Sequence, residues 1–211
     1  MSVLEGEGTT VILYGSTNVP TGARNHDGYL ARPDLMGEWP TVVVASPSYD
    51  AASSVKAICR DIARHGMAAV APRSGGMKAF IGFITNTAGH WSNAEFGFGM
   101  LALGDAAASA VADAAASDLV VSLALIDPVL TGDAVAALAQ IDVPVLGCSG
   151  RAASDGVTLA RSAAPQAEWV IYGDAGVGYW NVDAEGYVPT AAEDTEERVI
   201  EFFERTLPPR V

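Results

Sequence analysis

Three polar residues that follow predicted strands of this chain could perform proton-transfer chemistry. Asp127 comes directly after an apolar run, Tyr49 follows the run 41–45, and Arg73 comes shortly after the run 68–71. In a parallel sheet the carboxyl ends of the strands meet at one edge, where ligands bind. A carboxylate, a phenol and a guanidinium at that edge can transfer a proton or stabilise charge on a substrate. We therefore predict Asp127, Tyr49 and Arg73 as catalytic residues.

A second group of residues is predicted to form the walls of the same crevice. Most of them lie at the ends of predicted strands, and two lie in a segment that should cover the crevice. Apolar and aromatic walls with a few polar groups suit a mostly hydrophobic small molecule that carries oxygen functions. The predicted substrate-binding residues are Ser48, His90, Trp91, Gly99, Met100, Arg151, Val177, Tyr179 and Trp180.

Several of these residues also have a purely structural interpretation. Asp127 could cap the loop that follows it, as aspartate often does, and Arg73 could pair with a surface carboxylate. Tyr179 and Trp180 could serve packing alone, and His90 could be a solvated loop residue. The sequence leaves both interpretations open.

The elements that must position these residues alternate between strand and helix. Short apolar runs rich in β-branched residues are typical of strands buried on both faces of a parallel sheet. The fold class is therefore predicted as α/β, a doubly wound, mostly parallel sheet flanked by helices, in a single domain over residues 1–211. The predicted strands are 41–45, 68–71, 119–126, 143–148 and 168–172, and the predicted helices include 100–116 and a closing helix from residue 190.

The strand before the helix 100–116 has two candidate positions. Residues 80–85 have the composition of a strand, and residues 95–98 lie directly before Gly99 and the helix that follows it. A parallel sheet needs a crossover helix between the strand 68–71 and the next strand. We therefore predict a helix at 77–85 and a strand at about 95–98. The strand-to-helix turn would then fall at Gly99.

Six segments, taken together in chain order, indicate a resemblance to one protein family. They are Gly28-Tyr29-Leu30-Ala31-Arg32-Pro33, Thr41-Val42-Val43-Val44, Ala68-Ala69-Val70-Ala71-Pro72, Val143-Pro144-Val145-Leu146-Gly147, Tyr172-Gly173-Asp174-Ala175-Gly176-Val177-Gly178-Tyr179 and the pair Phe202-Phe203. In this order the chain resembles the dienelactone hydrolase family, which implies an α/β-hydrolase fold. The resemblance covers nearly the whole chain.

The resemblance implies where the catalytic triad of that family would lie. Its nucleophile falls on Gly99, its histidine on Val177, and its aspartate near Ala153, with Asp155 as a shifted candidate. If the strand lay at 80–85 instead, the nucleophile position would be Ile84. Neither glycine nor isoleucine can attack a substrate, and valine cannot act as a base. Hydrolysis through an acyl-enzyme is therefore not expected.

Composition limits the partners of the chain. A formal net charge of −13 would repel a phosphate backbone, so we predict no nucleic acid partner. Two cysteines and three scattered histidines lack the spacing of a metal site, and we predict no metal and no cofactor. No apolar run has the length of a membrane span, and no secretory signal is evident, so we expect no membrane association and a cytoplasmic location. The sequence does not indicate an oligomeric state.

Three functions fit these observations. The first is a non-hydrolytic enzyme that positions a small molecule and uses general acid or base catalysis for cyclisation, isomerisation or elimination, for example as a spiroacetal cyclase in polyketide secondary metabolism. The second is a catalytically inert pseudoenzyme or ligand-binding module. The third is a hydrolase with a displaced nucleophile. We favour the first, because the predicted crevice keeps polar side chains.

Overall fold

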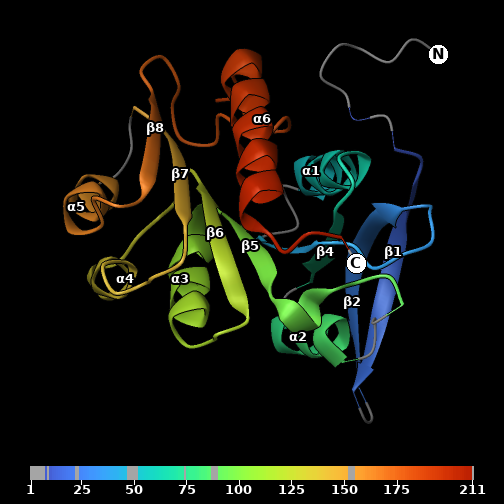
Figure 1. The fold of residues 1–211 in the computed structure, drawn as a ribbon. Helices are drawn as coiled ribbons and strands as arrows, with labels where there is room; N and C mark the ends of the chain where they lie inside the picture. Colours follow the sequence, from blue (N-terminus) through green and yellow to red (C-terminus); the bar gives the residue numbers. More distant parts are fainter. Residues whose placement is uncertain are drawn as a thin grey trace.

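The protein is built around one eight-stranded sheet (Figure 1). The computed structural model describes residues 8, 10–21, 24–46, 52–73, 75–86, 90–151 and 155–210. The strands lie in the order β1-β2-β4-β3-β5-β6-β7-β8. Their bounds are β1 (Ile12–Thr21), β2 (Arg24–Pro33), β3 (Thr41–Ala45), β4 (Ala68–Pro72), β5 (Phe98–Leu103), β6 (Val120–Ile126), β7 (Val145–Gly150) and β8 (Glu168–Tyr172).

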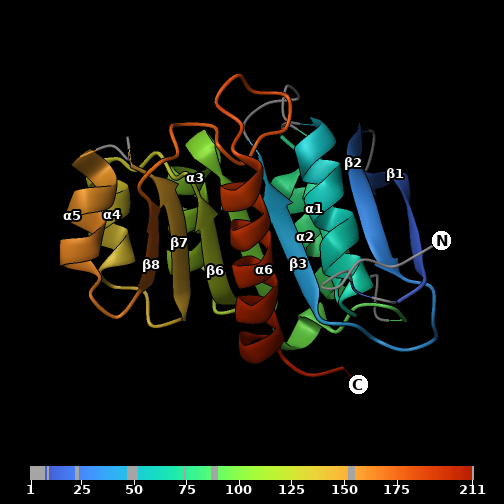
Figure 2. The same cartoon turned by 90° about the horizontal axis from the view of Figure 1, so that it is seen from above.

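Helices cover both faces of this sheet (Figure 2). α1 and α6 pack on one face, and α2, α3, α4 and α5 pack on the other. No helix in the described part of the chain is long and apolar enough to cross a membrane. The helices are α1 (Ala52–Arg64), α2 (Met77–Asn86), α3 (Ala107–Ala115), α4 (Gly132–Leu138), α5 (Asp155–Ala163) and α6 (Pro189–Thr206), with short 3₁₀ turns at Ala94–Phe96 and Gly104–Ala106.

The sheet is mostly parallel, as predicted. All neighbouring strands from β4 through β3 to β8 pair in parallel, whereas β1, β2 and β4 pair antiparallel. Every residue of β3 and β5 is buried, which explains why their sequences are apolar without interruption. The predicted α/β fold class is confirmed. The β1–β2 hairpin was not among the predicted strands, because its many exposed and polar residues give no buried apolar run.

The central strand lies at a different place from the predicted one. The helix predicted at 77–85 is confirmed as α2. The strand predicted at 95–98 is wrong, because β5 begins only at Phe98 and continues to Leu103. The helix predicted from Met100 is correspondingly too long, since α3 begins at Ala107. A short buried strand and a buried helix have the same apolar composition, so only the pairing of β5 with β3 and β6 distinguishes them.

Candidate functional site

The turn from β5 into α3 forms the elbow of the sheet, and it lies at Gly104. Gly104 follows the last residue of β5 with a φ of +54°, a conformation that favours glycine. Small residues, Ala102 and Ala106, lie two positions to either side. A Cβ atom at Gly104 would meet no atom within 4 Å, so the space above the turn is open. The predicted elbow at Gly99 is therefore wrong by five positions, although a glycine occupies both places.

Gly99 and Met100 lie inside β5 and not at its carboxyl end. Gly99 pairs with Val42 near the start of β3, and a Cβ atom there would lie 2.7 Å from the Phe203 ring of α6. Glycine at this position lets the helix approach the strand closely. Met100 is fully buried in the core on the other face. The expected placement of both residues in the crevice is wrong, because the start of a parallel strand lies at the opposite edge from its ligand-binding end.

Asp127 lies at the carboxyl end of β6, as predicted, and its loop contacts the elbow. It is 7% exposed and, at φ 48°, is the one non-glycine residue with a positive φ in the described chain. Its Oδ2 atom accepts a hydrogen bond of 2.6 Å from the Gly178 backbone N–H. The Val129 N–H donates to the Gly104 carbonyl at 3.1 Å, which ties the loop to the elbow. Asp127 does not cap the following helix, where the Thr131 side chain is the N-cap.

Burial raises the pKa of the Asp127 carboxyl above its ordinary value. The backbone N–H groups of Gly178 and Gly150 act in the opposite direction, because they stabilise the anion. A carboxyl with a raised pKa exchanges its proton closer to neutral pH than an exposed aspartate does. The position and environment of Asp127 therefore suit an acid or a base.

The segment 173–188, which we call the β8–α6 loop, carries the position that the resemblance assigns to histidine. Val177 occupies this position and is 69% exposed. Tyr179 is fully buried, and its hydroxyl shares a hydrogen bond of 2.9 Å with the Thr195 hydroxyl of α6. Burial raises the pKa of the Tyr179 phenol, which keeps it protonated. Trp180 is also buried. Both aromatic residues belong to the loop and pack into the core, which is the structural role considered for them.

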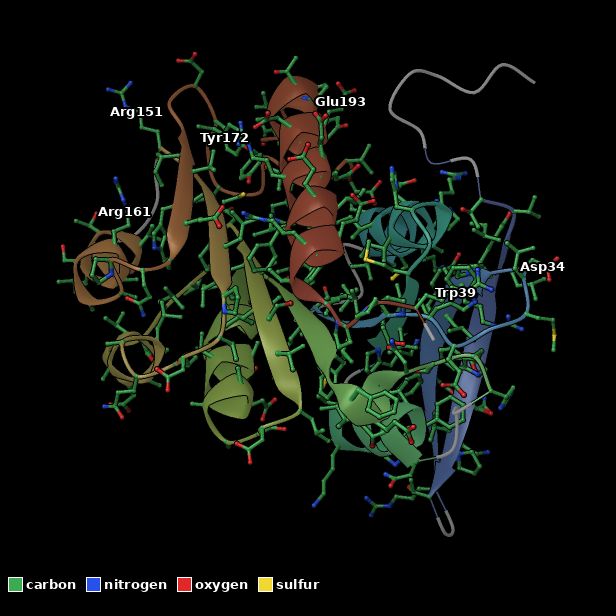
Figure 3. The ribbon with its side chains drawn as sticks, in the orientation of Figure 1. Asp34, Trp39, Arg151, Arg161, Tyr172 and Glu193 are labelled. Atoms are coloured by element: carbon green, nitrogen blue, oxygen red, sulfur yellow. The ribbon has the colours of Figure 1, made fainter. Side chains whose placement is uncertain are left out.

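Two more contacts hold the β8–α6 loop. The Ser54 hydroxyl of α1 accepts a hydrogen bond of 2.9 Å from the Val182 N–H and donates one of 3.1 Å to Asn181 Oδ1. Directly after β7, the Arg151 N–H donates a hydrogen bond of 2.8 Å to the Ala175 carbonyl of the loop. The side chain of Arg151 itself is exposed and points outward (Figure 3). The loop is therefore fixed by α1, α6, the end of β6 and the end of β7.

Arg73 lies at the carboxyl end of β4, but β3 separates this strand from the elbow strand β5. Its guanidinium lies 3.8 Å from the Asp27 carboxylate, and both side chains are about half exposed. The Arg73 N–H also donates to the Asp27 carbonyl at 2.8 Å. The pairing with a surface carboxylate, considered as the structural role of Arg73, is thus present.

Trp91 lies at the amino edge of the sheet, so the expected cover of the crevice by residues 90 and 91 is wrong. Its carbonyl accepts a hydrogen bond of 3.0 Å from the Trp39 N–H, just before β3 begins. Trp91 is buried there, and His90 beside it is exposed. The reason is topological. After α2 the chain must return to the amino edge before β5 can run parallel to β3.

Ser48 and Tyr49 lie outside the described residues, and so does Ala153. Sequence reasoning missed Gly104 as the elbow and Ser54 as an anchor of the β8–α6 loop. The spacing of Ala102, Gly104 and Ala106 was a usable signal for the elbow, because small residues on both sides let strand and helix meet at a sharp turn.

No group of three or more His, Cys, Asp or Glu side chains in the described part of the chain could hold a metal ion. Cys59 and Cys148 are both buried and free. Burial raises the pKa of each thiol to about 12, which makes them poor nucleophiles.

The strand order, the two helix layers and the elbow define an α/β-hydrolase fold. No protein-family model and no curated protein matches the chain. Among solved structures, it is similar to a candidate dienelactone hydrolase from Klebsiella pneumoniae, with a TM-score of 0.79 and 20% identity over 92% of this chain and 99% of that one. A dienelactone hydrolase from Anabaena variabilis gives a TM-score of 0.72 and 16% identity over 93% and 99%.

A more distant likeness is to the acylaminoacyl peptidase from Pyrococcus horikoshii. Its TM-score is 0.73 at 11% identity, over 95% of this chain but only 42% of that one. These likenesses confirm the fold that the sequence resemblance to the dienelactone hydrolases implied.

Proposed function

We propose that this protein is a non-hydrolytic enzyme that holds a small, mostly apolar, oxygenated molecule at the carboxyl edge of the sheet. The proposal rests on two neighbouring residues. Gly104 forms an elbow with open space above it, and Asp127 supplies a buried carboxyl whose pKa is raised. Cyclisation and isomerisation fit such a site, because both depend on orientation and proton transfer and need no covalent intermediate.

An acyl-enzyme route is not part of the proposal. Glycine at position 104 supplies no nucleophile, and Val177 supplies no base to activate one. Exposed apolar side chains flank the edge instead, at Val129 after β6 and at Val177 and Val182 in the β8–α6 loop. They suit a substrate with a large hydrocarbon part.

One reaction of this class is the closure of a dihydroxy ketone to a spiroacetal. One hydroxyl first adds to the ketone to give a hemiacetal, and the second then displaces the hemiacetal hydroxyl as water. The protonated Asp127 carboxyl gives its proton to the departing hydroxyl of the hemiacetal. The carboxylate then takes the proton of the attacking hydroxyl, so the group returns to its starting state. Orientation in well-aligned intramolecular reactions reaches effective molarities on the order of 10⁵ M or more, and proton transfer adds about 10² to 10⁴ in rate.

A ligand-binding module without catalysis is the second candidate, and one observation favours it. The Asp127 carboxylate already accepts a hydrogen bond of 2.6 Å from the Gly178 N–H. Anchoring of the β8–α6 loop would by itself account for a buried aspartate at this position.

The measurement that separates the two candidates is product formation from linear dihydroxy ketones, with and without protein. Asp127→Asn keeps the shape and removes the titrating group, so turnover should fall by about 10² or more with little change in affinity. Asp133→Asn, on the exposed first turn of α4, is the matched control and should change neither. A wild-type protein that binds a precursor but gives no rate or stereochemical bias over background would overturn the enzymatic proposal in favour of the binding module.

A further inference from the structure

α1 and α6 lie side by side on one face of the sheet (Figures 1 and 2), and a carboxyl group from each helix lines one small cavity between them. Asp61 of α1 and Glu196 of α6 line the same cavity of about 10 Å³, just below the end of β6. The rest of its lining is aliphatic and consists of Ile58, Ile62, Ile126, Val199 and Ile200. Carboxyl groups are rare in such surroundings, because an unpaired charge there is poorly solvated.

The groups that face Glu196 are negative or apolar. Asp61 acts on it from α1, and Glu193 acts on it from the preceding turn of α6, near the upper end of the helix (Figure 3). The strand β6 contributes only the side chain of Ile126. No described residue donates a hydrogen bond to the Glu196 carboxylate. Burial, and then the repulsion from Asp61 and Glu193, raise the pKa of the Glu196 carboxyl to about 7.

Asp61 has the positive partners that Glu196 lacks. The Arg64 guanidinium lies 2.7 Å from the Asp61 carboxylate, and Arg60 and His65 also favour its charged form. Burial raises the pKa of the Asp61 carboxyl, but these three neighbours oppose that effect. When the pair takes up one proton, Glu196 is therefore the carboxyl that holds it.

The same two helices hold the β8–α6 loop. Ser54, two turns before Asp61 on α1, binds Val182 and Asn181, and Thr195, next to Glu196 on α6, binds Tyr179. Because the loop is tied to both helices, a change in their packing acts on it from two sides.

We propose that the Asp61–Glu196 pair is a proton switch that sets how firmly α6 packs against α1 and, through Ser54 and Thr195, how well the β8–α6 loop is held. With a proton on Glu196, the pair carries a single charge, which Arg64 balances. Without it, two carboxylates repel each other in an aliphatic cavity, and the contact opens more readily. The switch is independent of the proposed function, since it holds for a catalytic loop and for a binding loop alike.

The size of the effect follows from the two pKa values. The closed contact raises the pKa of Glu196 from its ordinary 4.5 to about 7, so the closed state prefers the protonated form. Its stability relative to an open, solvated state therefore decreases as the pH rises towards 7 and stays low above it. Proton linkage between these values makes opening about tenfold more favourable at pH 8 than at pH 6.

Amide hydrogen exchange of the full chain tests the switch, with rates expressed as protection factors so that the intrinsic pH dependence cancels. Protection of residues 173–188 in the wild type should be about tenfold lower at pH 8 than at pH 6. Glu196→Gln should abolish the difference, because the side chain no longer titrates. Glu197→Gln, an exposed position on the same helix, is the control and should keep the difference.

Asp61→Asn is a second test of the same pair. It removes the charge that acts on Glu196 from α1, so the difference in protection between pH 6 and pH 8 should become smaller. Equal protection at the two pH values in the wild type would overturn the proposal. A difference that persists at full size in Glu196→Gln or in Asp61→Asn would overturn it as well.

Discussion

Thiol reactivity at the elbow tests the placement of β5 directly. In the structure, the side chain of Gly104→Cys would enter open space at the start of a helical turn. In Gly99→Cys, the Cβ atom would lie 2.7 Å from the Phe203 ring and 3.1 Å from Leu207. We therefore expect a reactive thiol at position 104 and a buried, destabilising one at position 99.

The two native cysteines should react too slowly with a thiol reagent to obscure the introduced one. At pH 7.5 an ordinary thiol of pKa about 8.5 is about one-tenth ionised, whereas a thiol of pKa about 12 is ionised in about one molecule in 30,000. Cys59 and Cys148 should thus react about three thousandfold more slowly, even before burial slows them further. Position 104 also begins the 3₁₀ turn that leads into α3, and a helix start lowers the pKa of a cysteine.

Stability changes accompany both substitutions. The crowding of Phe203 by Gly99→Cys should cost about 1–3 kcal/mol. This corresponds to a decrease in Tm of about 2–12 °C for a chain of this size. Gly104→Cys should cost about 1–2 kcal/mol, because a side chain at φ +54° is strained. Reactivity, and not stability, is therefore the quantity that separates the two positions.

The assay is titration with an aromatic disulfide reagent under native conditions, followed by absorbance. We expect no rapid equivalent of thiol in the wild type, one in Gly104→Cys and none in Gly99→Cys. Titration in denaturant should give all three thiols in each variant, which controls for oxidation. A rapidly labelled Gly99→Cys together with an unreactive Gly104→Cys would refute the strand register and the assignment of the elbow.

Three further predictions concern stability. Ser54→Ala removes two hydrogen bonds to the β8–α6 loop, one of them from Val182, and should lower the free energy of unfolding in urea by about 1–3 kcal/mol; no change would show that the loop is held elsewhere. Gly82→Ala in α2 meets no atom within 4 Å and should raise that free energy by about 0.5–1 kcal/mol, whereas a loss would contradict the open surroundings. Arg198 lowers the pKa of the Asp194 carboxyl, so the charged pair stabilises the folded state at neutral pH. The increase in Tm that this pair gives should be lost as the pH falls below about 4, and it should be absent in Asp194→Asn at every pH.

The fold class could be predicted because its evidence is local. The runs 41–45 and 168–172 have the composition of strands, and both form strands with these bounds, the first fully buried and the second at the edge of the sheet. The crossover rule for parallel sheets placed the helix at 77–85, where α2 lies. The position of Asp127 directly after an apolar run likewise predicted its place at the carboxyl edge of the sheet.

The elbow could not be placed in the same way. Gly97, Gly99 and Gly104 all lie in one apolar stretch, and each could form a turn on composition alone. The structure separates them by contacts with distant parts of the chain: Gly99 faces Phe203 of α6, whereas the space beside Gly104 is empty. Such contacts join residues about a hundred positions apart, so local periodicity does not predict them.

By itself the sequence determined the alternation of strand and helix and the residue types available at the strand ends, because secondary structure and burial follow largely from local composition. Only the tertiary structure decided which of those ends lie together. Topology placed Trp91 at the amino edge, Arg73 against Asp27, and Asp127 beneath the β8–α6 loop. The physical reason is that strand order and register are fixed by hydrogen bonds and packing between distant segments, whose free energy no short stretch of sequence specifies.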